Sequence, residues 1–177
     1  LYNLNIFVSF VLSRLLMYGV YCFYKAPSDF STFLAAFHKC DAGWYRQYVT
    51  DIYNHEMFQN VGNGQASWAF FPLMPLIMAG VWKLTKFKVS LQVVAFFVNA
   101  ILLMISEFFA FKYIELTRKR KDMGLYYIFF MSFGLYSFYF SILYTEALFI
   151  CLLTLCYYFM KRKNYILVGV FGALLSA

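Results

Sequence analysis

The sequence has 177 residues, of which 63% are hydrophobic and only 13% are charged. Soluble domains average about half apolar and about a quarter charged residues, so these residues cannot cover a water-soluble surface. The excess apolar surface must therefore face lipid. The formal net charge of +7 does not indicate a nucleic-acid partner, because the basic residues lie in short clusters between apolar runs and not along one soluble face.

The first apolar run, residues 4–24, is long enough to span a bilayer. Its only charge is Arg14. A cation in hydrocarbon requires a partner, and Glu107 and Glu146 in later apolar runs are the candidates. Two interpretations stay open: these residues form a buried ion pair that fixes helix packing, or they line the polar pathway of a transporter.

Residues 25–67 form a long loop of mixed polarity, expected on the outer side of the membrane. Within it, residues 28–37 and 42–53 carry apolar side chains at helical spacing. This pattern predicts two short amphipathic helices that lie on the membrane surface. Ser28 is the predicted N-cap of the first.

Further apolar runs follow the loop. Residues 68–82 form a short run with two prolines in its first half, interpreted as a re-entrant or interfacial helix, whereas residues 89–116 form a clear span. Residues 123–141 and 142–160 predict a hairpin of two short helices, and residues 164–177 begin a span that is cut short. The chain is therefore interpreted as the N-terminal portion of a single polytopic membrane domain.

The basic clusters bear on the topology of these runs. They lie at residues 83–88, 118–121 and 161–163, and basic loops tend to stay on the cytoplasmic side. If residues 118–121 and 161–163 lie on the inner side, the single span at residues 89–116 places residues 83–88 on the outer side. Either residues 68–82 are re-entrant on the outer side, which we prefer, or one basic loop departs from the rule.

Asp41 is the main candidate for chemistry because it precedes a predicted amphipathic helix just outside the membrane. A carboxylate there can act as a general base or bind a cation. The alternative interpretation is a helix N-cap, since Asp is a favoured capping residue. The surrounding segment supplies aromatic rings that can stack on a sugar, and it reads Lys39-Cys40-Asp41-Ala42-Gly43-Trp44-Tyr45.

The sequence shows no metal or phosphate motif. His55 and Glu56 adjoin, but no second His follows at the spacing of a zinc-binding helix. The Gly62-Asn63-Gly64 turn lacks the strand and helix pattern of a phosphate loop, and the four scattered cysteines are interpreted as free thiols. No cofactor is expected, and the sequence leaves a divalent metal open.

Three segments in a fixed order resemble one known family. They are residues 41–45 (Asp-Ala-Gly-Trp-Tyr), 70–75 (Phe-Phe-Pro-Leu-Met-Pro) and 144–149 (Tyr-Thr-Glu-Ala-Leu-Phe). The chain resembles the N-terminal part of the PIG-V family of mannosyltransferases, which add the second mannose to the glycosylphosphatidylinositol (GPI) anchor, and of their bacterial relatives. Ser13-Arg14-Leu15 is also similar to theirs. Two positions depart from the family pattern: Cys40 stands where the family usually has Trp, and Met74 where it usually has Tyr.

The resemblance implies an all-α, multi-pass transmembrane bundle of the GT-C type with amphipathic juxtamembrane helices. It also implies an inverting glycosyltransferase that uses a polyprenyl- or dolichyl-phosphate sugar, commonly mannose, in GPI anchor biosynthesis or a related pathway. The implied partners are the lipid-linked donor, a lipid or glycan acceptor and an accessory membrane subunit. The implied location is the endoplasmic reticulum membrane in a eukaryote or the plasma membrane in a bacterium.

The resemblance also assigns roles to residues. Asp41 matches the family's acidic position and is the expected base that takes the proton of the acceptor hydroxyl. The leaving phosphate requires cationic donors, for which Arg46, Lys39 and Arg14 are candidates. Glu146 would orient the acceptor or Arg14. The remaining expected substrate contacts are Trp44, Tyr45, Phe71, Pro72 and Tyr144.

The main alternative from another class is a transporter or lipid flippase fragment. There, Arg14, Glu107 and Glu146 line a polar pathway and Asp41 is only a cap. A structural or assembly subunit without a site is the third interpretation.

Overall fold

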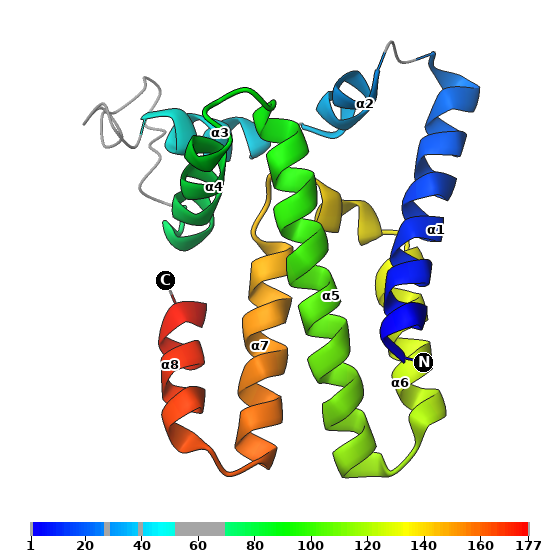
Figure 1. The fold of residues 1–177 in the computed structure, drawn as a ribbon, viewed down its shortest axis with the longest axis vertical. Helices are drawn as coiled ribbons and strands as arrows, with labels where there is room; N and C mark the ends of the chain where they lie inside the picture. Colours follow the sequence, from blue (N-terminus) through cyan, green and yellow to red (C-terminus); the bar gives the residue numbers. More distant parts are fainter. Residues whose placement is uncertain (1, 27–28, 39–40, 52–69, 177) are drawn as a thin grey trace.

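A computed structural model describes residues 2–26, 29–38, 41–51 and 70–176. Throughout these residues the regular structure is helical and no strand occurs, so the helical class expected from the sequence is confirmed there (Figure 1). The elements in chain order are α1 (Tyr2–Tyr24), α2 (Phe30–Phe37), α3 (Ala42–Asp51), α4 (Leu73–Leu84), α5 (Leu91–Arg118), α6 (Lys121–Phe133), the 3-10 helix η3 (Ser137–Ser141), α7 (Glu146–Lys161) and α8 (Tyr165–Leu175).

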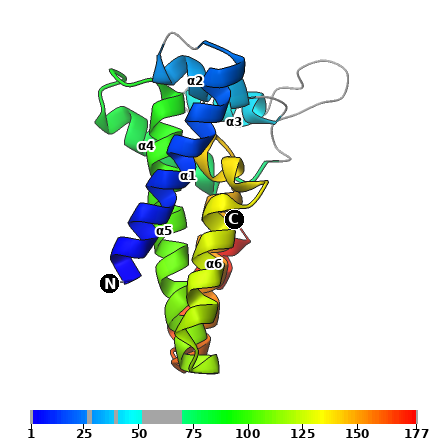
Figure 2. The same cartoon turned by 90° about the vertical axis from the view of Figure 1, so that its right-hand side faces the viewer.

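Helix α5 is the axis around which the others pack. It is 28 residues long and contacts α1, α2, α4, α6, α7 and η3. Helix α8 packs on α7. Figure 2 shows α2 and α3 gathered at one end of an elongated molecule, while α5 and α6 run together to the opposite end.

Two of the described helices, α1 and α5, are long and apolar enough to cross a membrane. About 20 apolar residues span the hydrocarbon core, and residues 3–24 and 91–118 meet that length. Helix α1 also leaves large apolar side chains exposed along its length, with Phe7 at 56%, Leu12 at 53% and Leu16 at 59% exposure. An apolar outer face of this kind suits contact with lipid.

Helix α4 is too short to cross a bilayer by itself, since it has 12 residues. Its C-terminal end and the turn that follows lie at the end of the bundle that carries α2 and α3 (Figure 1). The basic residues 83–88 therefore lie at that end, whereas residues 118–121 and 161–163 lie at the opposite end. The re-entrant interpretation of residues 68–82 stays a prediction, and residues 68 and 69 lie outside the described residues.

Helix α2 begins one residue later than expected. The N-cap is Asp29, not Ser28, and its carboxylate accepts a hydrogen bond from the Thr32 N–H at 2.7 Å. The physical reason is that a charged oxygen on extended backbone satisfies a free N–H and also suits the positive end of the helix dipole. Ser28 lies outside the described residues, as do residues 52 and 53 of the second predicted amphipathic helix.

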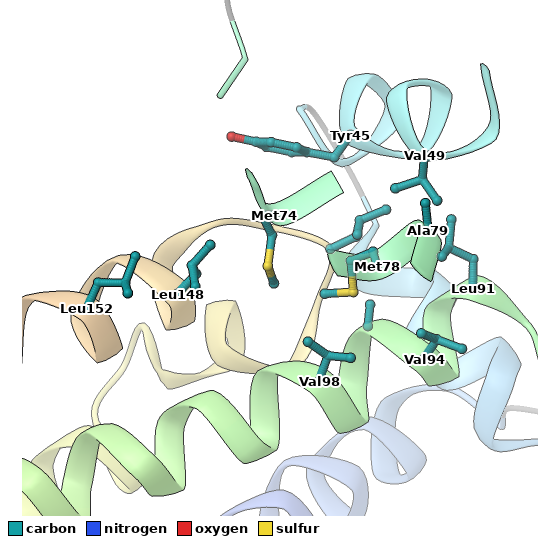
Figure 3. Close-up of a cluster of buried hydrophobic side chains, with 12 residues drawn as sticks. Tyr45, Val49, Met74, Met78, Ala79, Leu91, Val94, Val98, Leu148 and Leu152 are labelled. Carbon is teal, nitrogen blue, oxygen red and sulfur yellow. The ribbon is translucent and has the colours of Figure 1, made fainter. Parts of the chain in front are cut away.

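A core of buried side chains fixes α3 and α4 against the long helices (Figure 3). Tyr45 and Val49 of α3 pack with Met74 and Met78 of α4, and Met78 is fully buried. Burying one such side chain is worth about 1.5–3 kcal/mol. The same cluster includes residues of α5 and α7, namely Leu91, Val94, Val98, Leu148 and Leu152. This core holds the start of α3 close to the start of α7.

Candidate functional site

The three segments of the family resemblance meet at one place in the fold. Trp44 stacks on Phe70 with ring centroids 6.0 Å apart and an interplanar angle of 19°. The ring of Tyr45 lies 5.0 Å from that of Phe70 and 6.0 Å from that of Tyr144. We call these four rings the aromatic junction. It joins the start of α3, the segment before α4 and the segment before α7, which are far apart in sequence.

Tyr45 is the centre of the junction. Its side chain is 7% exposed, and its hydroxyl lies 3.4 Å from the Thr145 hydroxyl, within hydrogen-bond distance. Burial raises the pKa of the Tyr45 phenol, and the nearby charges of Glu146 and Asp41 raise it further. The phenol therefore stays protonated and can act as a hydrogen-bond donor, not as a base.

Asp41 lies at the exposed edge of this junction. It directly precedes α3, and its backbone carbonyl accepts a hydrogen bond from the Tyr45 N–H at 3.1 Å. Asp41 therefore stands directly before the first turn of α3, and a cap by its side chain stays a prediction. Its carboxylate also acts electrostatically on both Tyr45 and Glu146. An exposed carboxylate beside aromatic rings can accept a proton from a bound hydroxyl.

Glu146 is the first residue of α7. One of its carboxylate oxygens, Oε2, is buried and has no hydrogen-bond partner among the described residues. Buried polar atoms are normally paired. Glu146 therefore presents an unpaired acceptor close to Asp41 and Tyr45.

A cavity of about 560 Å³ opens beside Glu146. This volume falls in the range of small-molecule sites, which are mostly apolar with few polar groups. Thr145 and Glu146 are the polar lining residues, and Phe71 stands at its wall with 62% of its surface exposed. The other lining residues are apolar and come mainly from α4, α7 and α8: Leu73, Met74, Met131, Phe140, Leu148, Phe149, Ile150, Leu152, Leu174 and Leu175.

The structure gathers most of the predicted contacts, with four exceptions, of which Arg14 is described below. Arg46 is exposed on α3 and Pro72 is exposed before α4, and neither contacts the aromatic junction among the interactions found in the described residues. Lys39 lies outside the described residues. The sequence analysis did not single out Phe70 or Thr145. Phe70 stands in a family motif, but no pattern in the sequence distinguishes it from Phe71.

His38 is a further residue that the sequence analysis passed over as a site candidate. It caps the C-terminus of α2, and its Nε2 is buried without a hydrogen-bond partner among the described residues. Burial, together with the positive charge of Arg46, lowers the pKa of His38 to about 4. A neutral imidazole thus stands near the start of α3 at neutral pH.

Arg14 lies apart from the aromatic junction. Its Nη1 donates a hydrogen bond to the Ser137 carbonyl at 2.7 Å, and its guanidinium lies 5.0 Å from the centre of the Phe10 ring. Its electrostatic partner is Glu107. The expectation that Glu146 orients Arg14 is therefore not met, because Glu146 begins α7 while Glu107 lies on α5 beside α1. The ion pairs found among the described residues all involve other side chains, so Arg14 and Glu107 interact at a longer distance than a direct ion pair.

No group of three or more His, Cys, Asp or Glu side chains that could hold a metal ion occurs among the described residues. Cys22, Cys151 and Cys156 are free thiols, as expected. Cys40, His55, Glu56 and the turn at residues 62–64 lie outside the described part of the chain.

Comparison of the chain with protein-family models, with curated proteins and with solved structures gave no match in any of the three.

Proposed function

We propose that this protein is an integral, multi-pass membrane glycosyltransferase of the GT-C type. It transfers a sugar, most simply mannose, from a polyprenyl- or dolichyl-phosphate donor to a lipid-linked or glycan acceptor with inversion. The proposal rests on the motif resemblance to the PIG-V family together with the geometry of the aromatic junction.

One observation carries this proposal: three segments separated by up to about a hundred residues converge on one face. The ring contacts of Tyr45 with Phe70 and Tyr144 join all three segments directly. Asp41 stands at the exposed edge of these contacts, and the apolar cavity opens beside Glu146. A carboxylate, a set of sugar-stacking rings and an apolar cavity are the parts that a lipid-linked sugar requires.

The chemistry is a single displacement. The acceptor hydroxyl oxygen attacks the anomeric carbon and forms the new glycosidic bond, while the bond from that carbon to the lipid phosphate breaks on the opposite side. Asp41 takes the hydroxyl proton. The leaving phosphate gains negative charge, which Arg46, exposed on α3, and Lys39 would offset. The Glu146 carboxylate accepts a hydrogen bond from a sugar or acceptor hydroxyl, and the isoprenoid chain occupies the apolar cavity.

The transporter alternative receives less support from the geometry. A polar pathway requires Arg14, Glu107 and Glu146 to line one passage. Glu146 lines the cavity beside α4, α7 and α8, whereas Arg14 lines a separate apolar groove between α1 and α5, and the side chain of Glu107 is fully buried.

The test is sugar transfer in membranes that contain the full chain and the variant Asp41→Asn. Radiolabelled mannosyl phosphoryl dolichol is supplied with membrane lipids, and label in new lipid or glycan products is measured. Asn keeps the size of the side chain but cannot accept the proton, so we expect the rate to fall by about 10²- to 10⁴-fold.

The matched control is Asp122→Asn. Asp122 is also exposed, but it pairs with Arg120 at the opposite end of the bundle, so this variant should transfer sugar at the wild-type rate. Equal rates for Asp41→Asn and wild type would remove Asp41 as the base. A wild-type protein that transfers no sugar from this donor would contradict the proposed function.

A further inference from the structure

The segment between α6 and α7 is not α-helical, although it lies inside the bundle. Residues 134–145 contain η3 and two irregular connections, and they lead directly into Glu146. Ser141, Ile142 and Leu143 in this segment are almost fully buried. Irregular backbone at membrane depth needs protein partners for its free carbonyl groups, because lipid offers none. Two such carbonyls have a side-chain partner from a neighbouring helix.

The first partner is Arg14 on α1. Its Nη1 donates to the carbonyl of Ser137, the residue that begins η3, at 2.7 Å. Arg14 is 7% exposed, so this bond is shielded from solvent. A charged donor makes a stronger hydrogen bond than a neutral one.

The second partner is Asn99 on α5, which is fully buried. Its Nδ2 donates to the carbonyl of Ile142, the residue that directly follows η3. The same carbonyl accepts the backbone N–H of Tyr144 at 2.9 Å. Asn99 thus binds the Ile142 carbonyl, which also closes the turn that leads to Tyr144 of the aromatic junction.

Glu107 on α5 adds a third buried polar contact beside this arrangement. It is fully buried on α5, acts electrostatically on Arg14, and accepts a hydrogen bond from the Ser132 hydroxyl at 3.0 Å. Ser132 lies near the end of α6, two residues before the irregular segment begins. The end of α6 and both ends of η3 are therefore tied to α1 and α5 by buried polar side chains.

We propose that Arg14 and Asn99 are positioning residues that clamp the two ends of η3 and so set where Tyr144, Thr145 and Glu146 stand in the site. This inference rests on the proposed function for its catalytic consequence, but the clamp itself is a structural claim. It gives the intramembrane Arg a role distinct from binding the donor phosphate and from lining a transport pathway.

The first experiment measures the clamp without any activity. Backbone hydrogen–deuterium exchange is followed by mass spectrometry on the full chain in lipid nanodiscs, for wild type, Asn99→Leu and Arg14→Met. Each variant should raise the exchange rate of peptides within residues 134–145 by about 10-fold. Exchange in α4, to which neither side chain makes a hydrogen bond among the described residues, should not change.

Matched controls come from the same two helices. Ser106→Ala on α5 removes a buried hydroxyl that lies 3.4 Å from the Ile150 carbonyl of α7, and Ser13→Ala on α1 removes one that bonds to its own helix at Phe10. Neither hydroxyl makes a hydrogen bond to residues 134–145 among the described residues, so both variants should show wild-type exchange there. Arg14→Lys keeps a cationic donor and should restore part of the protection lost in Arg14→Met.

The second experiment measures sugar transfer by the same variants. Displacing a reacting group by about 1 Å can cost about 10²-fold, so each single variant should lower kcat by about 10- to 100-fold while the KM for the donor changes little. Because both residues act through one segment, the double variant should be no slower than the slower single variant, to within a factor of about two.

The outcomes separate the two proposals. Unchanged exchange in residues 134–145 for Asn99→Leu overturns the clamp, whatever the activity. If Arg14→Met does not assemble, the Asn99→Leu result decides. An Arg14→Lys variant with a raised donor KM and wild-type exchange would make Arg14 a donor ligand and overturn the inference. Faster exchange in a protein that transfers no sugar upholds the clamp and contradicts only the proposed function.

Discussion

At the residue scale, the site combines groups whose ionisation their surroundings control. The Tyr45 phenol is kept protonated by burial and by the nearby Asp41 and Glu146 charges, whereas Asp41 remains exposed. The two groups therefore divide donor and acceptor roles at one junction. His38 lies at the same end of the molecule, and its pKa, lowered to about 4, keeps the imidazole neutral at physiological pH.

We predict that stability at this end of the molecule falls as the pH drops below about 6.5. The pKa of His38 is lowered to about 4 in the folded protein, while an unfolded His titrates near 6.5. The unfolded state therefore binds the proton more readily, so the contribution is complete above pH 6.5 and is lost as the pH falls toward 4. Allowing for solvent screening at this partly exposed group, the loss is roughly 1–2 kcal/mol.

Thermal unfolding in nanodiscs between pH 7.5 and 4.5 measures this effect. His38→Gln removes the titrating group, so its melting temperature should change less with pH than that of the wild type. Identical pH profiles for the two proteins would show that His38 does not carry the dependence.

At the element scale, the contact between α5 and α6 depends on a glycine. A Cβ added at Gly124 of α6 would collide with the ring of Phe111 on α5, and Phe111 is itself 2% exposed. The ring has little room to move, because protein interiors are close-packed. This close approach brings the first turn of α6 against α5.

We predict that Gly124→Ala destabilises the bundle. Overpacking a well-filled contact costs about 1–3 kcal/mol, which outweighs the better helix propensity of Ala. The melting temperature in nanodiscs should fall. The control is Gly169→Ala in α8, where no atom lies within 4 Å of the added Cβ, so its melting temperature should be unchanged or higher. A Gly124→Ala protein as stable as Gly169→Ala would show that Phe111 yields easily.

At the scale of the whole molecule, the two ends of the bundle carry different elements. One end carries α2, α3 and the turn after α4, and the other carries the turns between α5 and α6 and between α7 and α8 (Figure 1). The aromatic junction belongs to the first end. A donor lipid would therefore be used from one leaflet only, the one that faces Asp41.

We predict that the basic residues at the two ends lie on opposite sides of the membrane. Lys88→Cys and Arg162→Cys are made separately in a background with Cys22 and Cys40 changed to Ser, and sealed vesicles of known orientation are treated with a membrane-impermeant maleimide. Lys88→Cys should react from the outer side and Arg162→Cys from the inner side, because the α5 span separates the two ends of the bundle. Labelling of both from the same side would contradict a bilayer crossing by α5.

Part of the site could be predicted from the sequence because its motifs are local. The order Asp41, then Phe71 and Pro72, then Tyr144 and Glu146 is visible in the chain itself. The sequence does not show that these motifs meet through Tyr45, because ring contacts between distant segments depend on how α3, α4 and α7 pack. Arg14 shows the same limit. Its need for a partner follows from burying a cation, but a ranking of acceptors by charge favours Glu107 and Glu146 over the Ser137 carbonyl that it binds.

The sequence by itself determined that the chain is helical, that its surface is apolar and where the two long helices run, since composition and local periodicity set these properties. Only the tertiary structure decided which distant residues share a site and which carbonyls Arg14 and Asn99 hold. A backbone carbonyl becomes free only where a helix ends inside the bundle. Gly134 marks the end of α6 in the sequence, but the partners of the free carbonyls that follow depend on how α1 and α5 pack around that segment.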